Sequence, residues 1–319
     1  MKENEKQQLN MRQGAYILLF AIAANLVMQF VLSGVQLAVT KSTGKDIASS
    51  DYFQIACMLC LQVAFFVVPF AFWLMRKKQP PVLRFPLKPV PRACYGLLLA
   101  PLTILAFFFP TQVFALFLEK IGYTFSAGVR FNTAGKLVLG LFATVVLAPF
   151  IEELIFRGCL LSGLTERFGR WGAALLCGLS FSLMHMNPEQ TVYQFFLGVV
   201  CALAVMESGS LLTGVVTHAM SNLLAILLDV TPLGSAAVYR FANFALKRAW
   251  RTALVTVLCA AAGVALLWLV LRFIKKGREE ETLSPHQLEK GGLSPLLPYI
   301  AACVICAVMW AAVFAAAML

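Results

Sequence analysis

The sequence predicts an all-α protein, a polytopic membrane bundle of about eight or nine transmembrane helices. Of its 319 residues, 60% are hydrophobic and only 13% are charged, and the mean hydropathy is +0.81. A soluble domain is typically about 25% charged, so this chain has too little polar surface to face water on all sides. Apolar runs of about 18 residues or more recur along the chain, which is the pattern of membrane-spanning helices. The short alternating strands of a membrane barrel are not seen in the pattern, so helices are the expected spanning element.

The apolar segments give the expected helices in chain order. The first, from Gly14 to about Val39, is too long for a signal-peptide core and ends without a small-residue cleavage site, so we expect a retained helix. We expect residues 1–319 to form a single integral membrane domain. The nine candidate helices cover residues 14–39, 53–75, 93–118, 137–166, 171–187, 191–207, 210–229, 252–274 and 296–319.

The fourth candidate helix, 137–166, is longer than one membrane crossing requires. Its 30 residues would extend about 45 Å at 1.5 Å per residue, so we expect it to tilt, kink or project beyond the bilayer. Pro149 lies near its midpoint and predicts a kink there.

The basic residues predict the orientation. The loop 76–92 holds six cations and five prolines, and the positive-inside rule places it in the cytoplasm together with the N-terminus. The cations of 272–278 then also lie inside, whereas those of 235–251 would lie outside, against the rule. We expect Ser235–Trp250 to be an amphipathic segment along the interface. The net charge of +11 favours anionic lipid over nucleic acid as the partner, and we expect a bacterial cell membrane.

Charged residues inside an apolar run are the strongest functional signal. Glu152, Glu153 and Arg157 follow the apolar stretch 137–151. A charge at membrane depth costs roughly 2.5–3.5 kcal/mol on insertion scales, so such residues are seldom kept without a function. Glu153 and Arg157 are four residues apart and can pair on one helix face. Glu152 is rotated by about 100° from Glu153, so we expect it to face a cavity instead.

Two histidines lie in later apolar segments, each with a motif partner one turn away. His185 shares a helix face with Phe181, and His218 shares one with Asn222. An acid, two imidazoles and an amide are the groups needed to hydrolyse an amide bond. A desolvated carboxylate can take a proton from water, and imidazole and amide N–H groups can stabilise the oxyanion. The sequence shows no nucleophile elbow and no H-E-x-x-H motif.

The three motifs together resemble a known family. Glu152-Glu153-x-x-x-Arg157, Phe181-x-x-x-His185 and His218-x-x-x-Asn222 occur in this order in the CAAX prenyl protease and bacteriocin-processing (CPBP, also called ABI) family of intramembrane endopeptidases. The resemblance covers residues 137–229, which would be the catalytic core helices. It implies a protease whose substrate is a peptide or a membrane protein, with or without a lipid group.

The family resemblance also implies roles for individual residues. Glu152 and His185 would activate water, and His218 and Asn222 would form the oxyanion hole. Glu153 and Arg157, with Phe181 beside them, would support the geometry of the site.

Three alternatives remain at the level of the sequence. A zinc-dependent protease would use Glu152, His185 and His218 as ligands. We favour a mechanism without metal or other cofactor, because no spare carboxylate is left to act as the base beside a zinc-ligating Glu152. A non-catalytic immunity or partner protein of the same fold would not need the intact set of site residues. A transporter usually shows repeated halves, and no repeat is evident here.

Overall fold

The computed structural model describes residues 9–47, 50–87, 94–125, 133–231, 249–276 and 292–318, with single positions at 236, 240 and 244. Within these residues the chain is helical and without strands, which confirms the expected all-α membrane bundle. Eight helical segments are long and apolar enough to cross a membrane. The expected interfacial segment Ser235–Trp250 lies largely outside the described residues.

The helices follow the order that the apolar segments predicted. The bounds are α1 (Met11–Thr43), α2 (Asp51–Lys77), α3 (Tyr95–Lys120), α4 (Ala134–Leu141), η3 (Phe142–Leu147), α5 (Ala148–Glu153), η4 (Leu154–Leu160), α6 (Leu161–Met184), η5 (Pro188–Gln190), α7 (Thr191–Ser208), α8 (Leu211–Val230), α10 (Ala249–Lys276), η6 (Ser294–Leu296) and α11 (Leu297–Ala317).

The expected fourth and fifth helices form one continuous segment from Ala134 to Met184. The break between them lies at Gly169, whose φ of 68° and ψ of −178° are not helical. Only glycine adopts such a backbone conformation readily, so the residue type sets the position of the turn. Upstream, η3 and η4 are π-helices on either side of the single α turn α5. Pro149 is therefore accommodated by the switch from π-helical to α-helical hydrogen bonding just before it, at the boundary of η3 and α5.

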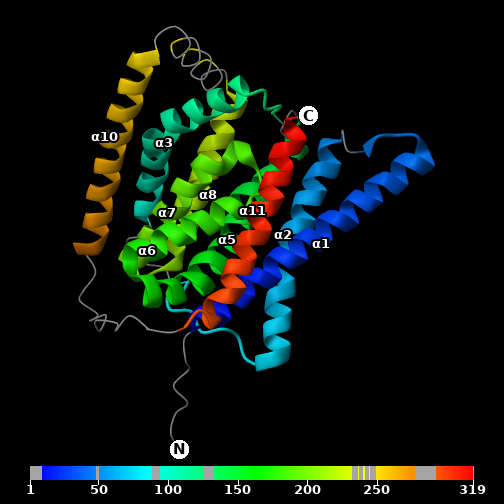
Figure 1. Ribbon diagram of the computed structural model, residues 1–319, viewed down its shortest axis with the longest axis horizontal. Coiled ribbons are helices and arrows are strands. Elements are labelled where there is room, and N and C mark those ends of the chain that lie inside the picture. The colour runs from blue at the N-terminus through cyan, green and yellow to red at the C-terminus, as the bar shows by residue number, and fades with distance from the viewer. Residues whose placement is uncertain are drawn as a thin grey trace, which may run out of the picture.

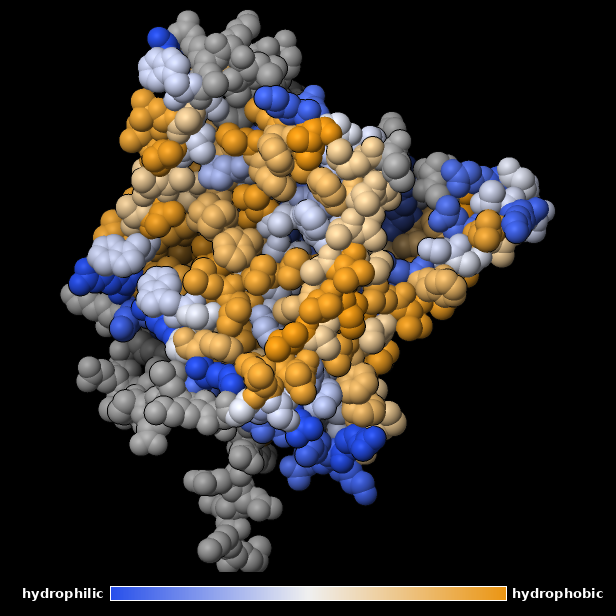
Figure 2. Space-filling view, in the orientation of Figure 1, coloured by the Kyte–Doolittle hydropathy of each residue, from blue (hydrophilic) through white to orange (hydrophobic). Residues whose placement is uncertain are grey.

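Figure 1 shows how the helices surround the segment that carries the acids. α5 to α8 lie in the middle of the bundle, with α1 and α2 on one side, α3 and α10 on the other, and α11 across the front. The span Pro188–Ser208, which consists of η5 and α7, is the most buried of the candidate spans. Figure 2 shows a mainly apolar surface across the middle of this face of the bundle and hydrophilic residues toward its upper and lower ends, as expected of a membrane-embedded surface.

Small residues allow the central helices to approach closely. Gly198 on α7 faces Gly178 on α6, and a Cβ at Gly198 would lie 2.7 Å from the Gly178 Cα. The first turn of α1 approaches η4 and α6 in the same way, because Gly14 and Gly163 leave no room for a Cβ. Such contacts are the usual basis of helix association in membranes, where burial of apolar surface gives no advantage over lipid.

Candidate active site

The two acids of the first motif lie at the end of α5, between two π-helices. π-helical turns are rare and occur mostly at functional sites, because the extra residue per turn reorients the side chains around it. Here the α turn Ala148–Glu153 presents Glu152 and Glu153 to helix α8. The unusual backbone and the intramembrane acids thus coincide in one segment.

Glu153 and Arg157 form the ion pair that their spacing predicted. The Glu153 Oε1 atom lies 2.8 Å from Arg157 Nη1, and both side chains are fully buried. Arg157 Nη2 donates a hydrogen bond of 2.9 Å to the carbonyl oxygen of Gly198 on α7. The guanidinium carbon also lies 4.6 Å from the centroid of the Phe181 ring. Arg157 therefore joins the first motif to α7 and to the second motif.

His218 lies between the two acids. Its Nδ1 atom is 3.1 Å from Glu153 Oε1, and its Nε2 atom is 3.8 Å from Glu152 Oε2. The first distance is a hydrogen bond, whereas the second is too long for one and leaves an electrostatic contact. The two nitrogens of the His218 imidazole thus face different acids, Nδ1 toward Glu153 and Nε2 toward Glu152.

Gly214 makes room for this arrangement on α8. It lies one turn before His218, and a Cβ at this position would lie 2.6 Å from Glu153 Oε2. Real Cβ atoms do not approach an oxygen this closely, so any larger residue would displace the Glu153 carboxylate. The glycine is thus required by the close approach of a buried carboxylate to the helix backbone.

His185 follows the last residue of α6, and its Nδ1 lies 2.8 Å from the Phe181 carbonyl oxygen. A carbonyl only accepts hydrogen bonds, so Nδ1 carries the proton and Nε2 keeps its lone pair when the ring is neutral. The Phe181 ring packs edge-on against His185 and against His218, with centroid distances of 4.8 and 5.3 Å. The two imidazoles therefore share one aromatic wall.

The family resemblance implies that Glu152 and His185 both act on water, whereas the imidazole that the structure places beside the Glu152 carboxylate is His218. Among the described residues, His218 is the imidazole that comes within 4.0 Å of the Glu152 carboxylate. Glu153 and His218 are buried, whereas Glu152, with 15% of its side chain exposed, and His185 are only partly buried. Glu152 and His185 are thus less buried than Glu153 and His218, although the Glu152 Oε2 atom is itself buried and has no hydrogen-bond partner among the described residues.

Asn222 caps a backbone carbonyl that the π-helix leaves without a partner. Its Nδ2 atom donates a 2.7 Å hydrogen bond to the carbonyl oxygen of Thr144. In η3, Ala148 donates to Ala143, five residues back, and Pro149 has no N–H to donate to Thr144. One N–H of the Asn222 amide is therefore engaged, and the second remains for another acceptor.

Sequence reasoning missed four parts of this site. Three of them are hydrogen bonds between helices: from His218 to Glu153, from Arg157 to the Gly198 carbonyl, and from Asn222 to the Thr144 carbonyl. The fourth is the space that Gly214 leaves for the Glu153 carboxylate. The one available signal was Gly214, four residues before His218 on a helix interior, where glycine is otherwise unfavourable.

A metal ion would need several ligating side chains that converge on one point. Across the part of the chain that the structure describes, no group of three or more His, Cys, Asp and Glu side chains is arranged to hold a metal ion. His218 Nδ1, one of the nitrogens of the hypothetical zinc set, faces Glu153.

Comparison with known proteins agrees with the motifs. Residues 134–224 match the sequence model of the family described as type II CAAX prenyl endopeptidase Rce1-like. The matched segment holds all three motifs, and the match confirms the family resemblance that they predicted.

Among curated proteins, the chain is 32% identical over 96 residues to an uncharacterized 24.3 kDa protein of Escherichia coli. This alignment covers 28% of the chain and 44% of the relative, so the chain spans less than half the length of that protein. No solved structure matches the chain.

Proposed function

We propose that this protein is an intramembrane endopeptidase that hydrolyses a peptide bond with water activated by Glu152 and His185. The observation that carries the proposal is the placement of Glu152 and Glu153 on either side of the His218 imidazole, inside a segment that matches an endopeptidase family. Such a cluster is costly within a membrane, and neither packing nor helix stability requires it.

In the proposed reaction, the Glu152 carboxylate takes one proton from a water molecule while the remaining hydroxide attacks the scissile carbonyl carbon. His185, with its Nε2 lone pair free, orients the same water. The carbon–nitrogen bond then breaks, and the proton held by Glu152 passes to the leaving amine. Glu152 ends as a carboxylate again, so atoms and charge balance over the cycle.

The oxyanion formed in this step needs hydrogen-bond donors. His218 can donate from Nε2 only as an imidazolium, because its Nδ1 proton is directed to Glu153. The second N–H of Asn222 supplies the other donor. Electrostatic stabilisation of this kind is usually the largest contribution to catalysis.

We propose that the reaction needs no metal. Zinc bound by Glu152, His185 and His218 would require another general base, and Glu153 is occupied by Arg157 and His218. Glu152 is then better used as the base than as a ligand. The substrate class is proposed as a peptide or membrane protein that reaches Glu152 from the bilayer.

The test uses the full-length protein reconstituted in liposomes with a panel of internally quenched peptides, half of which carry a C-terminal farnesylated cysteine. Glu152→Gln keeps the size of the side chain but removes its basicity, so we expect a loss of about 10²–10⁴-fold in kcat. Glu119→Gln, an exposed acid at the end of α3, is the matched control and should leave kcat unchanged. Full activity of the Glu152→Gln enzyme would overturn the proposed role of Glu152.

A further inference from the structure

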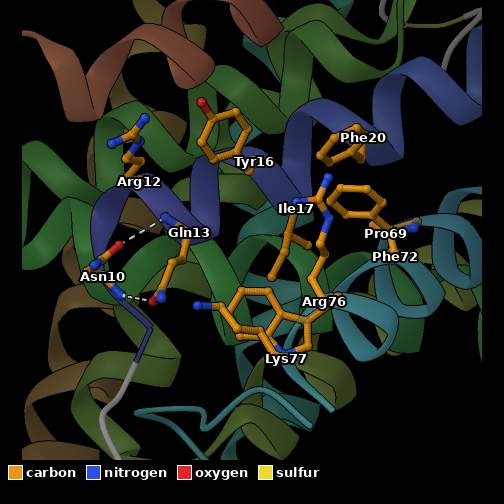
Figure 3. Close-up of a pocket in the computed structure, with 11 residues that line it drawn as sticks. Asn10, Arg12, Gln13, Tyr16, Ile17, Phe20, Pro69, Phe72, Arg76 and Lys77 are labelled. Atoms are coloured by element: carbon orange, nitrogen blue, oxygen red, sulfur yellow. Dashed lines mark hydrogen bonds between the residues drawn. The ribbon is translucent and has the colours of Figure 1, made fainter. Parts of the chain in front are cut away.

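A second site lies away from the acids, on α1 and α2. The first turns of α1 and the last turns of α2 line an open cavity of about 680 Å³. Figure 3 shows its lining, in which side chains from both helices converge. None of the proposed catalytic residues belongs to this lining, so the cavity is separate from the candidate active site.

Positive charge without acidic partners among the described residues distinguishes this cavity. Arg12, Arg76 and Lys77 line it, and the lining includes no Asp or Glu. None of the three lies within 4.0 Å of a described acidic group. Arg12 lies over the Tyr16 ring at 5.8 Å, and Arg76 lies over the Phe72 ring at 5.2 Å. The aromatic faces hold the two guanidinium groups while their N–H donors remain available for an anion.

The lining changes from polar to apolar with depth. Its polar members lie at the ends of the helices, where α1 begins at Met11 and α2 ends at Lys77. Phe20 and Pro69 lie deeper, and Phe20 is nine residues, or about 13 Å, from the start of α1. The headgroup layer on one side of a bilayer is only about 5–8 Å thick, so the cavity extends from that layer into the hydrocarbon region.

We infer that this cavity binds the phosphate headgroup of an anionic membrane lipid. The three cations would contact the phosphate, and the aromatic and apolar residues below them would contact the glycerol and the start of the acyl chains. A soluble phosphate would use only the outer part of the lining, whereas a phospholipid matches both parts. Tyr and Trp side chains, here Tyr16 and Trp73, are the residues usually found at this level of a membrane.

The opposite face of the same α1 turn connects the site to the rest of the molecule. Gly14 packs against the backbone of η4 at Cys159, and Ser162 donates a 3.1 Å hydrogen bond to the carbonyl oxygen of Leu9. A lipid bound between α1 and α2 therefore stabilises a turn that rests on the central segment. A lipid that binds only the folded protein raises the melting temperature by mass action, so the melting temperature reports how much of the site is occupied by lipid.

The experiment measures lipid binding by the purified full-length protein with native mass spectrometry and a thermal melt in detergent. Dioleoylphosphatidylglycerol is the probe, and dioleoylphosphatidylcholine is the comparison lipid. The site variant carries Arg12→Gln, Arg76→Gln and Lys77→Gln. Each cation near a membrane surface is worth about fivefold in affinity, so we expect roughly 100-fold weaker binding of phosphatidylglycerol.

The matched control removes three cations at the opposite ends of the spans: Lys41→Gln, Lys45→Gln and Lys120→Gln. These side chains are exposed, and the net charge falls by the same amount. The control should bind phosphatidylglycerol as the unaltered protein does, within about threefold, if the cavity rather than total charge determines binding. Equal losses in the site variant and the control would overturn the inference.

Two further arms separate the remaining outcomes. sn-Glycerol 3-phosphate carries the same phosphate without acyl chains, and saturation of the site by it at lipid concentrations would assign the cavity to a soluble phosphate instead.

Arg76→Gln alone should weaken binding of phosphatidylglycerol about fivefold, and Arg12→Lys with Arg76→Lys should retain it. These milder variants decide the question if the triple variant does not fold, and unchanged binding in Arg76→Gln would contradict the inference. Neither readout depends on proteolysis.

Discussion

Asn222→Ala should lower both stability and catalysis, through two separate N–H groups of one amide. The first donates a hydrogen bond of 2.7 Å to the Thr144 carbonyl oxygen. This oxygen receives no backbone hydrogen bond from Ala148, which donates to Ala143, or from Pro149, which has no N–H. Loss of the Asn222 donor leaves a carbonyl without a partner inside the membrane, at a cost of about 1–3 kcal/mol in the free energy of unfolding. The second N–H is the proposed oxyanion donor, and its loss should lower kcat by about 10²–10³-fold.

Pro149→Ala separates the two effects, because it introduces a backbone N–H five residues after Thr144. In the π register of η3 this N–H can bond the Thr144 carbonyl and replace the Asn222 donor. We therefore expect Asn222→Ala to destabilise the Pro149→Ala background by clearly less than it destabilises the unaltered protein. The same double variant should show no recovery of kcat, since the oxyanion donor is still absent.

The assay combines denaturation in mixed micelles with initial rates on the best peptide of the panel, for the four proteins of this double-mutant cycle. Recovery of kcat together with stability would mean that Asn222 acts only through the helix, which would refute its role as an oxyanion donor. An equal destabilisation by Asn222→Ala in both backgrounds would refute the account of the Thr144 carbonyl.

Three other predictions test the site. Arg157→Gln leaves Glu153 as a buried acid without its cation, so the free energy of unfolding should fall by about 3–5 kcal/mol. The double variant Glu153→Gln with Arg157→Gln should be more stable than Arg157→Gln alone. A denaturation series that ranks the double variant as the least stable would contradict the pairing. Gly214→Ala adds a methyl group 2.6 Å from Glu153 Oε2, so we expect about 1–3 kcal/mol of destabilisation and a lower kcat, and normal values of both would refute the close approach. Elemental analysis should find no stoichiometric metal and chelators should leave activity intact; about one zinc per chain, with activity lost on removal and restored on re-addition, would overturn the metal-free mechanism.

The sequence predicted the helices well because lipid imposes a simple rule. A spanning helix must be apolar over about 20 residues, so composition alone locates it. The division of 134–184 into two helices also followed from the sequence, since the polar stretch near Gly169 interrupts the apolar pattern. The orientation of the bundle and the segment Ser235–Trp250 stay predictions.

The local backbone of the site was not predictable in the same way. The sequence prediction used 3.6 residues per turn throughout. In η3 and η4, however, the backbone hydrogen bonds join residues that are five apart. Pro149 indicated a kink but not the change of register that accommodates it. Contacts between helices, such as Glu153 with His218, depend on how α5 and α8 face one another, and no periodicity within one helix contains that information.

Glu153 links two of the motifs through a single oxygen atom. Its Oε1 lies 2.8 Å from Arg157 Nη1 and 3.1 Å from His218 Nδ1, so the charge that pairs with the guanidinium also orients the imidazole. Stability and catalysis must therefore respond differently to changes at this pair. The double variant Glu153→Gln with Arg157→Gln removes both buried charges and can regain stability, but it leaves His218 without the carboxylate that would balance an imidazolium. Glu153, fully buried beside the partly exposed Glu152, thus acts on the proposed reaction only through His218, as a positioning residue.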